Sequence, residues 1–416
     1  MRHRPSLQVS SFDTSSWNKK PRLAISGAFL FLSIRETIMT TTQEKPQKRR
    51  LASLDALRGM DMFWILGGEK IFAALFILTG WTGWQVAHGQ TLHSNWHGFT
   101  FYDLIFPLFI FLAGVAMGLS PKRIDHLPFS ERRVYYAKAL KRLFLLAGFG
   151  VLYNHGWGTG IPFNLDEIRY ASVLGRIAVA WFICAMLVWH TSLRTQIITA
   201  VSLLLGYWIL LCFIPVPGGQ AGQLTMAGTW NAWVDQHLLP GISYQNRATD
   251  PEGLLSNVPA VVNALMGVFA GRLIAKANEV GEWKTVGYLF AAGLVSLGCG
   301  WAWNTVFPVN KDLWTSSFVL VTVGWSLLFL ASFYAVVDLL NTQKYFYPFV
   351  IIGANSIVIY LASSLVKWEY IAQSVFGGVI GAVSEPWQPV LSVIALLAVQ
   401  LLVLHWLYKR KILISV

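Results

Sequence analysis

Two histidines and an aspartate lie close together in the segment TLHSNWHGFTFYDLIFP, which runs from Thr91 to Pro107. His93 and His97 are four residues apart, and Asp103 borders a long apolar run. Imidazole titrates near neutral pH, so His93 could act as a base or as a nucleophile. Asp103 could orient that imidazole or pair with a cation. We therefore interpret this segment as a candidate catalytic site.

Two other interpretations of the histidines remain open. If the segment is helical from His93 onward, His93, His97 and Thr100 share a face, and histidines at this spacing could chelate a metal ion. A third ligand would have to be His88 or Asp103, and no motif fixes it. Both histidines could equally lie on the surface without a role. We predict no metal site.

A second group of charged residues lies in the first apolar run, LDALRGMDMFWILGGEKIF (Leu54–Phe72). Ionisable groups inside a membrane span are costly and usually functional. On a straight helix with about 100° per residue, Asp55, Arg58 and Glu69 lie within about 60° of one another. An ion pair between Asp55 and Arg58 could simply fix the helix end. That pair does not explain Glu69, which should face a partner or a water-filled cavity.

Other motifs are less specific. GVAMG (Gly114–Gly118) is typical of close helix packing. DPEG (Asp250–Gly253) favours either a helix start, with Asp at the N-cap and Pro in the first turn, or a substrate contact. Asn355 lies inside an apolar run, where amides usually form hydrogen bonds across helices. Lys311 is a rare cation in a loop between two apolar runs.

The composition sets the class of protein. Of the 416 residues 55% are hydrophobic and 12% are charged, whereas soluble domains have about 25% charged residues. This balance predicts a polytopic membrane protein. The net charge is +12. The Lys and Arg residues lie in short loops between apolar runs, where they set the orientation in the membrane, so we expect no nucleic-acid partner. The three cysteines lie inside apolar runs and predict neither a disulfide nor a zinc framework.

Ten runs reach about 20 residues, the length that crosses a bilayer. They predict an all-α bundle of ten transmembrane helices within a transmembrane domain over residues 51–416, after a flexible or surface-lying tail over residues 1–50. The ten runs are 54–79, 99–119, 139–156, 171–190, 195–214, 254–275, 284–304, 315–339, 346–366 and 388–408. The Gly-rich stretch at residues 375–383 is too short to span.

The distribution of Lys and Arg predicts the orientation. They gather in alternate segments, among them QKRR (Gln47–Arg50), the loop Ser120–Arg142 and YKRK (Tyr408–Lys411). The opposite loops hold few cations: Arg169, Arg247, Lys311 and Lys367. Because cytoplasmic loops carry the excess of Lys and Arg, both termini should be cytoplasmic, and His93 should lie on the opposite side.

Six motifs, in order along the chain, resemble the heparan-α-glucosaminide N-acetyltransferase family and its bacterial relatives among the transmembrane acyltransferases. The motifs are SLDALRGMDMF, LHSNWHGFTFYDLIFPLFIFLAG, SVLGRIAVAWF, DPEGLLSNVPAVVNALMGVFAG, FPVNKDLWTSSFVL and FYPFVIIGANSIVIY. The resemblance runs from about Leu51 to the C-terminus. Several such motifs in order are far more specific than any one of them.

This resemblance implies acetyl transfer from cytoplasmic acetyl-CoA to the amino group of a glucosamine on the opposite side of the membrane. The family's active-site histidine lies three residues before a tryptophan, which corresponds to His93 before Trp96 and not to His97. Asp103 then belongs to the same site. Two departures stand out: Glu69 replaces an uncharged amide, and lysosomal members carry a luminal domain and an additional span before this region. The acceptor could therefore differ, for example a cell-wall or chitin-derived amino sugar.

We therefore predict a multi-pass protein of the bacterial inner membrane that acetylates a glucosamine-type amino sugar with acetyl-CoA as donor. Cations at the cytoplasmic mouth would bind the phosphates of CoA; the candidates are Arg58, Lys138, Lys141 and Arg142. The candidate acceptor contacts are Glu69, Asp250, Glu252, Asn310, Lys311 and Asn355. The alternative is a transporter of N-acetylglucosamine or a related sugar, because some bacterial relatives are described as such. A homodimer is left open.

Overall fold

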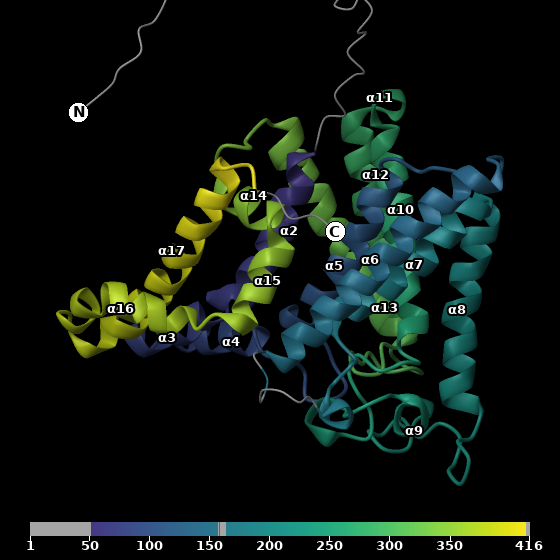
Figure 1. Cartoon of the computed structure of the whole chain (residues 1–416), viewed down its shortest axis with the longest axis horizontal. Coiled ribbons are helices and arrows are strands. Elements are labelled where there is room, and N and C mark those ends of the chain that lie inside the picture. Colours follow the sequence, from purple (N-terminus) through teal and green to yellow (C-terminus); the bar gives the residue numbers. More distant parts are fainter. Residues whose placement is uncertain (1–50, 157, 159–163, 413–416) are drawn as a thin grey trace, which may run out of the picture. The chain divides into compact units, whose positions relative to one another are not determined.

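The computed structural model describes residues 51–156, 158 and 164–412, and helices dominate them (Figure 1). Within these residues the β pairing is limited to one isolated antiparallel bridge, between Arg169 and Gly241. The all-α prediction is therefore confirmed for the described part of the chain. The tail predicted for residues 1–50 lies outside it.

The first half of the described chain contains α2 (Ala52–Phe63), the π-helical turn η1 (Trp64–Gly68), α3 (Lys70–Thr79), α4 (Thr82–Gln90), the 3₁₀ turn η2 (Phe101–Leu104), α5 (Ile105–Gly118), α6 (Phe129–His155), η3 (Leu165–Glu167), α7 (Val173–His190), α8 (Leu193–Phe213) and α9 (Trp230–Leu238). The second half contains η4 (Tyr244–Asn246), α10 (Asn257–Ala275), α11 (Ala277–Val280), α12 (Glu282–Trp303), α13 (Ser316–Phe333), the π-helical η5 (Tyr334–Leu339), α14 (Tyr347–Ala354), α15 (Ser356–Leu365), α16 (Trp368–Gly381), η6 (Glu385–Trp387) and α17 (Gln388–Lys409).

Seven of the described helices are long and apolar enough to cross a membrane, and the number rises to nine if each of two bent helix pairs is one span. The one predicted run that is not among these nine, 139–156, covers the C-terminal part of α6. The N-terminal part of this 27-residue helix is rich in charged residues, which lowers its mean hydropathy. The count of ten spans therefore stays a prediction.

Both bent pairs were expected to be single helices. The chain bends by 54° between η1 and α3, and by 75° between α14 and α15. The first bend follows Gly67, whose φ of 117° is readily adopted only by glycine. Glu69 lies at this break, between η1 and α3, so the break, and not the helical period, sets the direction of its side chain. The predicted straight stripe from Asp55 to Glu69 is therefore wrong beyond Gly67.

Small residues let the backbones of α5 and α10 approach closely. A Cβ atom on Gly114 would lie 2.0 Å from the carbonyl oxygen of Ala264, and one on Gly118 would lie 2.2 Å from that of Val268. A Cβ atom on Gly267 of α10 would likewise lie 2.0 Å from the carbonyl oxygen of Phe111 in α5. The prediction that Gly114–Gly118 serves helix packing is confirmed.

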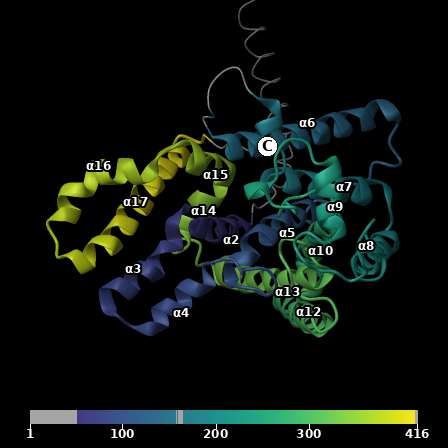
Figure 2. The same ribbon diagram turned by 90° about the horizontal axis from the view of Figure 1, so that it is seen from below.

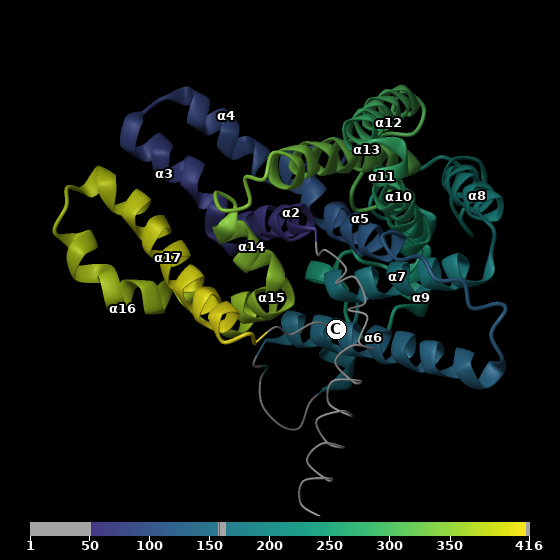
Figure 3. The ribbon, with the colours of Figure 1, turned by 90° about the horizontal axis from the view of Figure 1, so that it is seen from above.

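The helices pack mainly in pairs. α5 packs on α10, α12 on α13, α2 on α14 and α6 on α7. α3 contacts α4 and α17, and α16 contacts α17. Figures 2 and 3 show these last four helices on one side of the described domain, with α8 on the other side. The loops and turns that lead into α5, α7, α10 and α13 carry most residues of the candidate site.

The two ends of the bundle carry different elements. α11 lies at one end of α12, and the loop of residues 304–315 lies at the other, where Figure 1 also shows α9. We call these the α11 end and the α9 end. At the α9 end the Gly98 N–H donates to the Val309 carbonyl (2.8 Å). At the α11 end the Asp338 carboxylate accepts from the Ala52 N–H at the start of α2 (3.2 Å). α2 therefore begins at the end opposite to His93.

The orientation has a direct test. Ser130 lies in the first turn of α6 and Gln223 in the loop between α8 and α9, and both are exposed. Three helices, α6, α7 and α8, separate them. If each crosses the membrane, single cysteines at the two positions should react with a membrane-impermeant thiol reagent from opposite faces, Ser130→Cys from the cytoplasm. Labelling of both from one face would contradict the predicted orientation.

Candidate functional site

His93 lies in the non-helical stretch between α4 and η2, where it pairs with Asp103. Its Nδ1 lies 2.8 Å from the Asp103 Oδ1. The other carboxylate oxygen, Oδ2, accepts hydrogen bonds from the Ser94 N–H (3.2 Å), the Thr100 N–H (3.1 Å) and the Thr100 hydroxyl (3.1 Å). These donors hold the buried carboxylate in place. Asp103 thereby fixes the Nδ1–H tautomer and leaves Nε2 of His93 as a proton acceptor.

A capping box explains the local fold. Thr100 and Asp103 bond each other's backbone N–H groups at the start of η2, so the helical segment begins at Phe101. Helical structure from His93 onward was therefore a wrong assumption. The Nδ1 of His97 instead lies 3.3 Å from the amide nitrogen of Asn310, and partial burial lowers the pKa of His97. Within the described ranges, no group of three His, Cys, Asp or Glu side chains could hold a metal ion.

Lys311 also contacts His93. Its Nζ lies 3.0 Å from both ring nitrogens of His93 and 3.9 Å from the Asp103 Oδ1. Burial is the largest influence on Lys311 and lowers its pKa, although the Asp103 carboxylate opposes the shift. The tight turn before α13 presents this lysine, because the Asn310 Oδ1 accepts the Leu313 N–H (2.8 Å). Asn310 is fully buried; its amide oxygen serves this turn and its amide nitrogen faces His97.

Glu69 reaches the same site through Tyr102. The Tyr102 hydroxyl donates to the Glu69 Oε2 (2.8 Å). The Tyr102 ring lies against the His93 imidazole, with 4.8 Å between centroids. The expectation that Glu69 faces a partner is confirmed. Tyr102 itself was not singled out from the sequence, although it directly precedes Asp103.

Arg169 joins the loop before α10 to the segment before α7. Its Nε and Nη2 donate to the two oxygens of Asp250 (2.8 and 2.6 Å), and Nη2 also pairs with Glu252. The Asp250 carboxylate accepts the N–H groups of Tyr244 (2.7 Å) and Glu252 (2.8 Å) as well. Burial opposes ionisation, but the Arg169 guanidinium holds the pKa of Asp250 below its usual range.

These contacts correct the interpretation of DPEG. α10 begins at Asn257, with Ser256 at its N-cap, so Asp250 does not cap that helix. Its side chain is fully buried, and its oxygens are occupied by four donors. The geometry does not support a direct contact between Asp250 and a substrate; Asp250 orders the loop. Glu252 is less fully occupied and interacts electrostatically with Lys311.

Charged side chains from several loops converge at the α9 end. Arg247 lies 3.7 Å from Asp312, and Lys311 and Glu252 both interact electrostatically with Asp312. Burial raises the pKa of Asp312. The predicted outer loops hold four cations. Three of them form ion pairs or polar contacts here: Arg169, Arg247 and Lys311. Their scarcity in the sequence was a signal for this cluster.

The cations predicted to bind CoA lie away from this cluster. Arg58 is 3.7 Å from Asp55, which confirms the expected pair. Arg58 and Arg142 are close enough to repel each other electrostatically, so α2 and α6 bring two of the four candidates together. Lys138 and Lys141 are exposed on α6. The role of all four in binding CoA stays a prediction.

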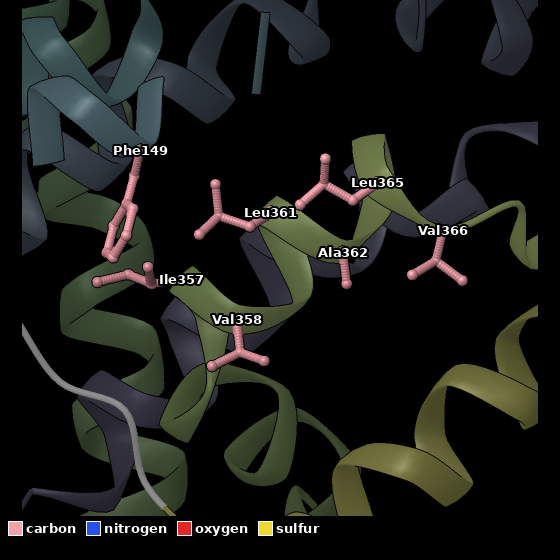
Figure 4. Close-up of a pocket in the computed structure, with 7 residues that line it drawn as sticks. All are labelled: Phe149, Ile357, Val358, Leu361, Ala362, Leu365 and Val366. Atoms are coloured by element: carbon pink, nitrogen blue, oxygen red, sulfur yellow. The ribbon is translucent and has the colours of Figure 1, made fainter. Parts of the chain in front are cut away.

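The surroundings of Asn355 are mainly apolar, whereas the His93 site is rich in charged side chains. Asn355 is buried at the bend between α14 and α15, and its contact with an acceptor stays a prediction. Beyond it, a pocket is lined by apolar side chains of α15 and its C-cap, with Phe149 of α6 (Figure 4). The lining residues are Phe149, Ile357, Val358, Leu361, Ala362, Leu365 and Val366. None of them carries a group for acid–base chemistry, so this pocket is not the reaction site.

Comparisons with known proteins support the resemblance. Residues 50–219 match the family model described as a domain of unknown function, DUF5009. The chain is 28% identical to the heparan-alpha-glucosaminide N-acetyltransferase of Mus musculus, over 78% of this chain and 55% of the mouse protein. It is 27% identical to that of Homo sapiens, over 75% of this chain and 52% of the human protein. The chain thus spans about half the length of these curated relatives. The resemblance predicted from the motifs is confirmed.

Proposed function

We propose that this protein transfers an acetyl group from acetyl-CoA to the amino group of a glucosamine-type amino sugar. The relatives are named for this type of transfer. The observation that carries the proposal is the pair formed by His93 and the buried Asp103, 2.8 Å apart. We further propose that residues 51–416 form the transmembrane acyltransferase domain, located in a bacterial inner membrane with both termini cytoplasmic.

The chemistry centres on Nε2 of His93. This nitrogen takes a proton from the acceptor amine as the amine attacks the acetyl carbonyl; the C–N bond forms and the C–S bond breaks. The imidazolium then protonates the CoA thiolate. The Asp103 carboxylate stabilises the imidazolium meanwhile. In a second route Nε2 accepts the acetyl group and passes it on. Both routes need the tautomer that Asp103 fixes.

The two substrates approach from opposite ends of the bundle in this proposal. α2 and η1 lead from Arg58 towards Glu69. Glu69 connects to His93 through Tyr102. Cations near the α11 end would bind the nucleotide of CoA, while the acetyl-bearing arm extends along α2. The acceptor would reach His93, whose side chain is 49% exposed, from the α9 end.

The acceptor would meet polar side chains that surround His93. We propose that Glu69 and Glu252 form hydrogen bonds with sugar hydroxyls or attract the amine, and that Lys311 contacts the acceptor amine beside His93. Asn310 would act through the turn that it stabilises, and Asp250 through the loop that it orders. Asn355 remains a candidate at a greater depth in the bundle. A homodimer also stays a proposal.

Arg58→Ala should weaken acetyl-CoA binding about 10- to 150-fold, because a hydrogen bond to a charged group contributes about 1.5–3 kcal/mol. Calorimetry on the detergent-purified protein measures this affinity. Arg194→Ala is the matched control, since Arg194 is an exposed arginine at the start of α8. Unchanged affinity in Arg58→Ala would place the coenzyme entrance elsewhere.

The test of the function is an assay of the purified protein with labelled acetyl-CoA and a panel of amino sugars. We expect a labelled N-acetyl sugar with at least one glucosamine-type acceptor. The comparisons lend no support to the transporter alternative, but the same protein in liposomes can test it. Uptake of N-acetylglucosamine without acetyl transfer would overturn the proposal.

A further inference from the structure

The proposed reaction must remove two protons from the acceptor nitrogen. An amino sugar near neutral pH is largely an ammonium ion, because the electron-withdrawing oxygens of the ring bring the pKa of its amine near that of an α-amino group, about 8. It loses one proton to gain a lone pair and a second as the C–N bond forms. The CoA thiolate takes up one of them, and the other goes to water. Nε2 of His93 holds one proton at a time, because Asp103 keeps Nδ1 protonated. The site therefore needs a second base if the ammonium form is to be used.

Lys311 is placed for this task. Its Nζ lies 3.0 Å from each ring nitrogen of His93. The N–H of Nδ1 and the lone pair of Nε2 point in diverging directions, so one amine cannot form good hydrogen bonds with both ring nitrogens. Lys311 is therefore beside the imidazole without being locked to it. Its side chain is only 14% exposed, whereas that of His93 is 49% exposed. An acceptor amine that reaches Nε2 consequently comes within reach of Lys311.

We propose that Lys311 is the second proton acceptor of the site and deprotonates the acceptor ammonium before His93 acts. This inference rests on the proposed acetyl transfer. The neutral Lys311 amine takes one proton from the ammonium. The resulting amine attacks the acetyl group, His93 takes the second proton and returns it to the thiolate, and Lys311 releases its proton to water. One ammonium and one thioester thus give one amide, one thiol and one proton.

The surroundings of Lys311 lower its pKa. The titratable and charged groups that face it come from the 93–103 segment, its own turn, the loop before α10 and α7: His93, Asp103, Asp312, Glu252 and Arg176. The three carboxylates raise the pKa of Lys311, while burial and Arg176 lower it, and burial prevails. Lys311 is thus easier to deprotonate than an exposed lysine.

The pH dependence of Lys311→Met tests this role. Without the second base, the enzyme can use only acceptor that is already neutral in water. We expect kcat/KM for glucosamine to fall about 10²-fold at about pH 6 and less than about threefold at about pH 9, where the amine is largely neutral. Lys311→Arg should show the same pH-dependent loss, because a guanidinium stays protonated. Lys284→Met, an exposed lysine of α12, is the control and should behave as the parent protein.

Each other outcome is decisive. An equal loss at every pH would mean that Lys311 acts through structure or charge, and would overturn the proposal. Full activity of Lys311→Arg at about pH 6 would also overturn it, because a permanent cation would then suffice. Acetyl-CoA binding, measured on both variants, shows that they are folded. Absence of acetyl transfer by the parent protein at every pH would instead refute the proposed function, and this inference with it.

Discussion

His93→Ala should lower the turnover of acetyl transfer by about 10²–10⁴, the usual contribution of a positioned acid–base group. The imidazole is half exposed and makes its polar contacts with Asp103 and Lys311. Its loss should therefore leave membrane insertion and acetyl-CoA binding intact. The measurement is kcat for acetyl transfer to glucosamine, with acetyl-CoA affinity determined on the same preparation.

His97→Ala is the matched control and should have a much smaller effect. His97 is four residues away and faces Asn310, not the pair of His93 and Asp103. If the two histidines bound a metal ion, both substitutions should lower the activity by a comparable factor, and a chelator should inhibit the parent protein. A surface role would predict that neither substitution matters. Full activity of His93→Ala would contradict the mechanism.

Asp103→Asn should lower kcat by about 10²–10⁴ through the wrong imidazole tautomer. Three donors, from Ser94 and Thr100, hold an oxygen at the Oδ2 position. The new amide would therefore turn its NH₂ group towards Nδ1 of His93. Nδ1 would then have to accept a hydrogen bond from this group. The imidazole proton would move to Nε2, which could no longer act as the base. The measurement is the kcat profile against pH.

Asp166→Asn provides the comparison, because Asp166 is an exposed aspartate in the 3₁₀ turn before α7. It should leave the rate unchanged. Acetyl-CoA affinity should be the same in both variants, since neither residue lies near Arg58 along α2. A rate for Asp103→Asn close to that of the parent protein would show that the tautomer does not control the reaction.

The features that the sequence predicted best depend on local pattern. Apolar runs identify helices because a bilayer-spanning segment must satisfy its backbone internally. The glycines at 114 and 118 predicted close packing because a Cβ atom there would collide with the backbone of α10. His93 and Asp103 stood out because they are ten residues apart in one segment, and a capping box then brings them together.

The features that the sequence did not predict depend on contacts between distant segments. Lys311 lies 218 residues from His93, and Arg169 lies 81 residues from Asp250. No local period encodes such pairs. The bend at Gly67 was missed because a glycine within an apolar run is compatible with a straight helix. The buried Arg176 lies within an apolar run, as Asp55 and Arg58 do, but the sequence does not show which groups it contacts.

The most direct test of the account reconstitutes the protein in liposomes, with labelled acetyl-CoA on the face that the Ser130→Cys label identifies and glucosamine on the other. We predict that labelled N-acetylglucosamine forms in the glucosamine compartment, that unlabelled CoA remains in the donor compartment, and that His93→Ala liposomes form almost none. Labelled product only where both substrates share one compartment would contradict transfer across the membrane. Equal product from parent and His93→Ala liposomes would contradict the central role of His93.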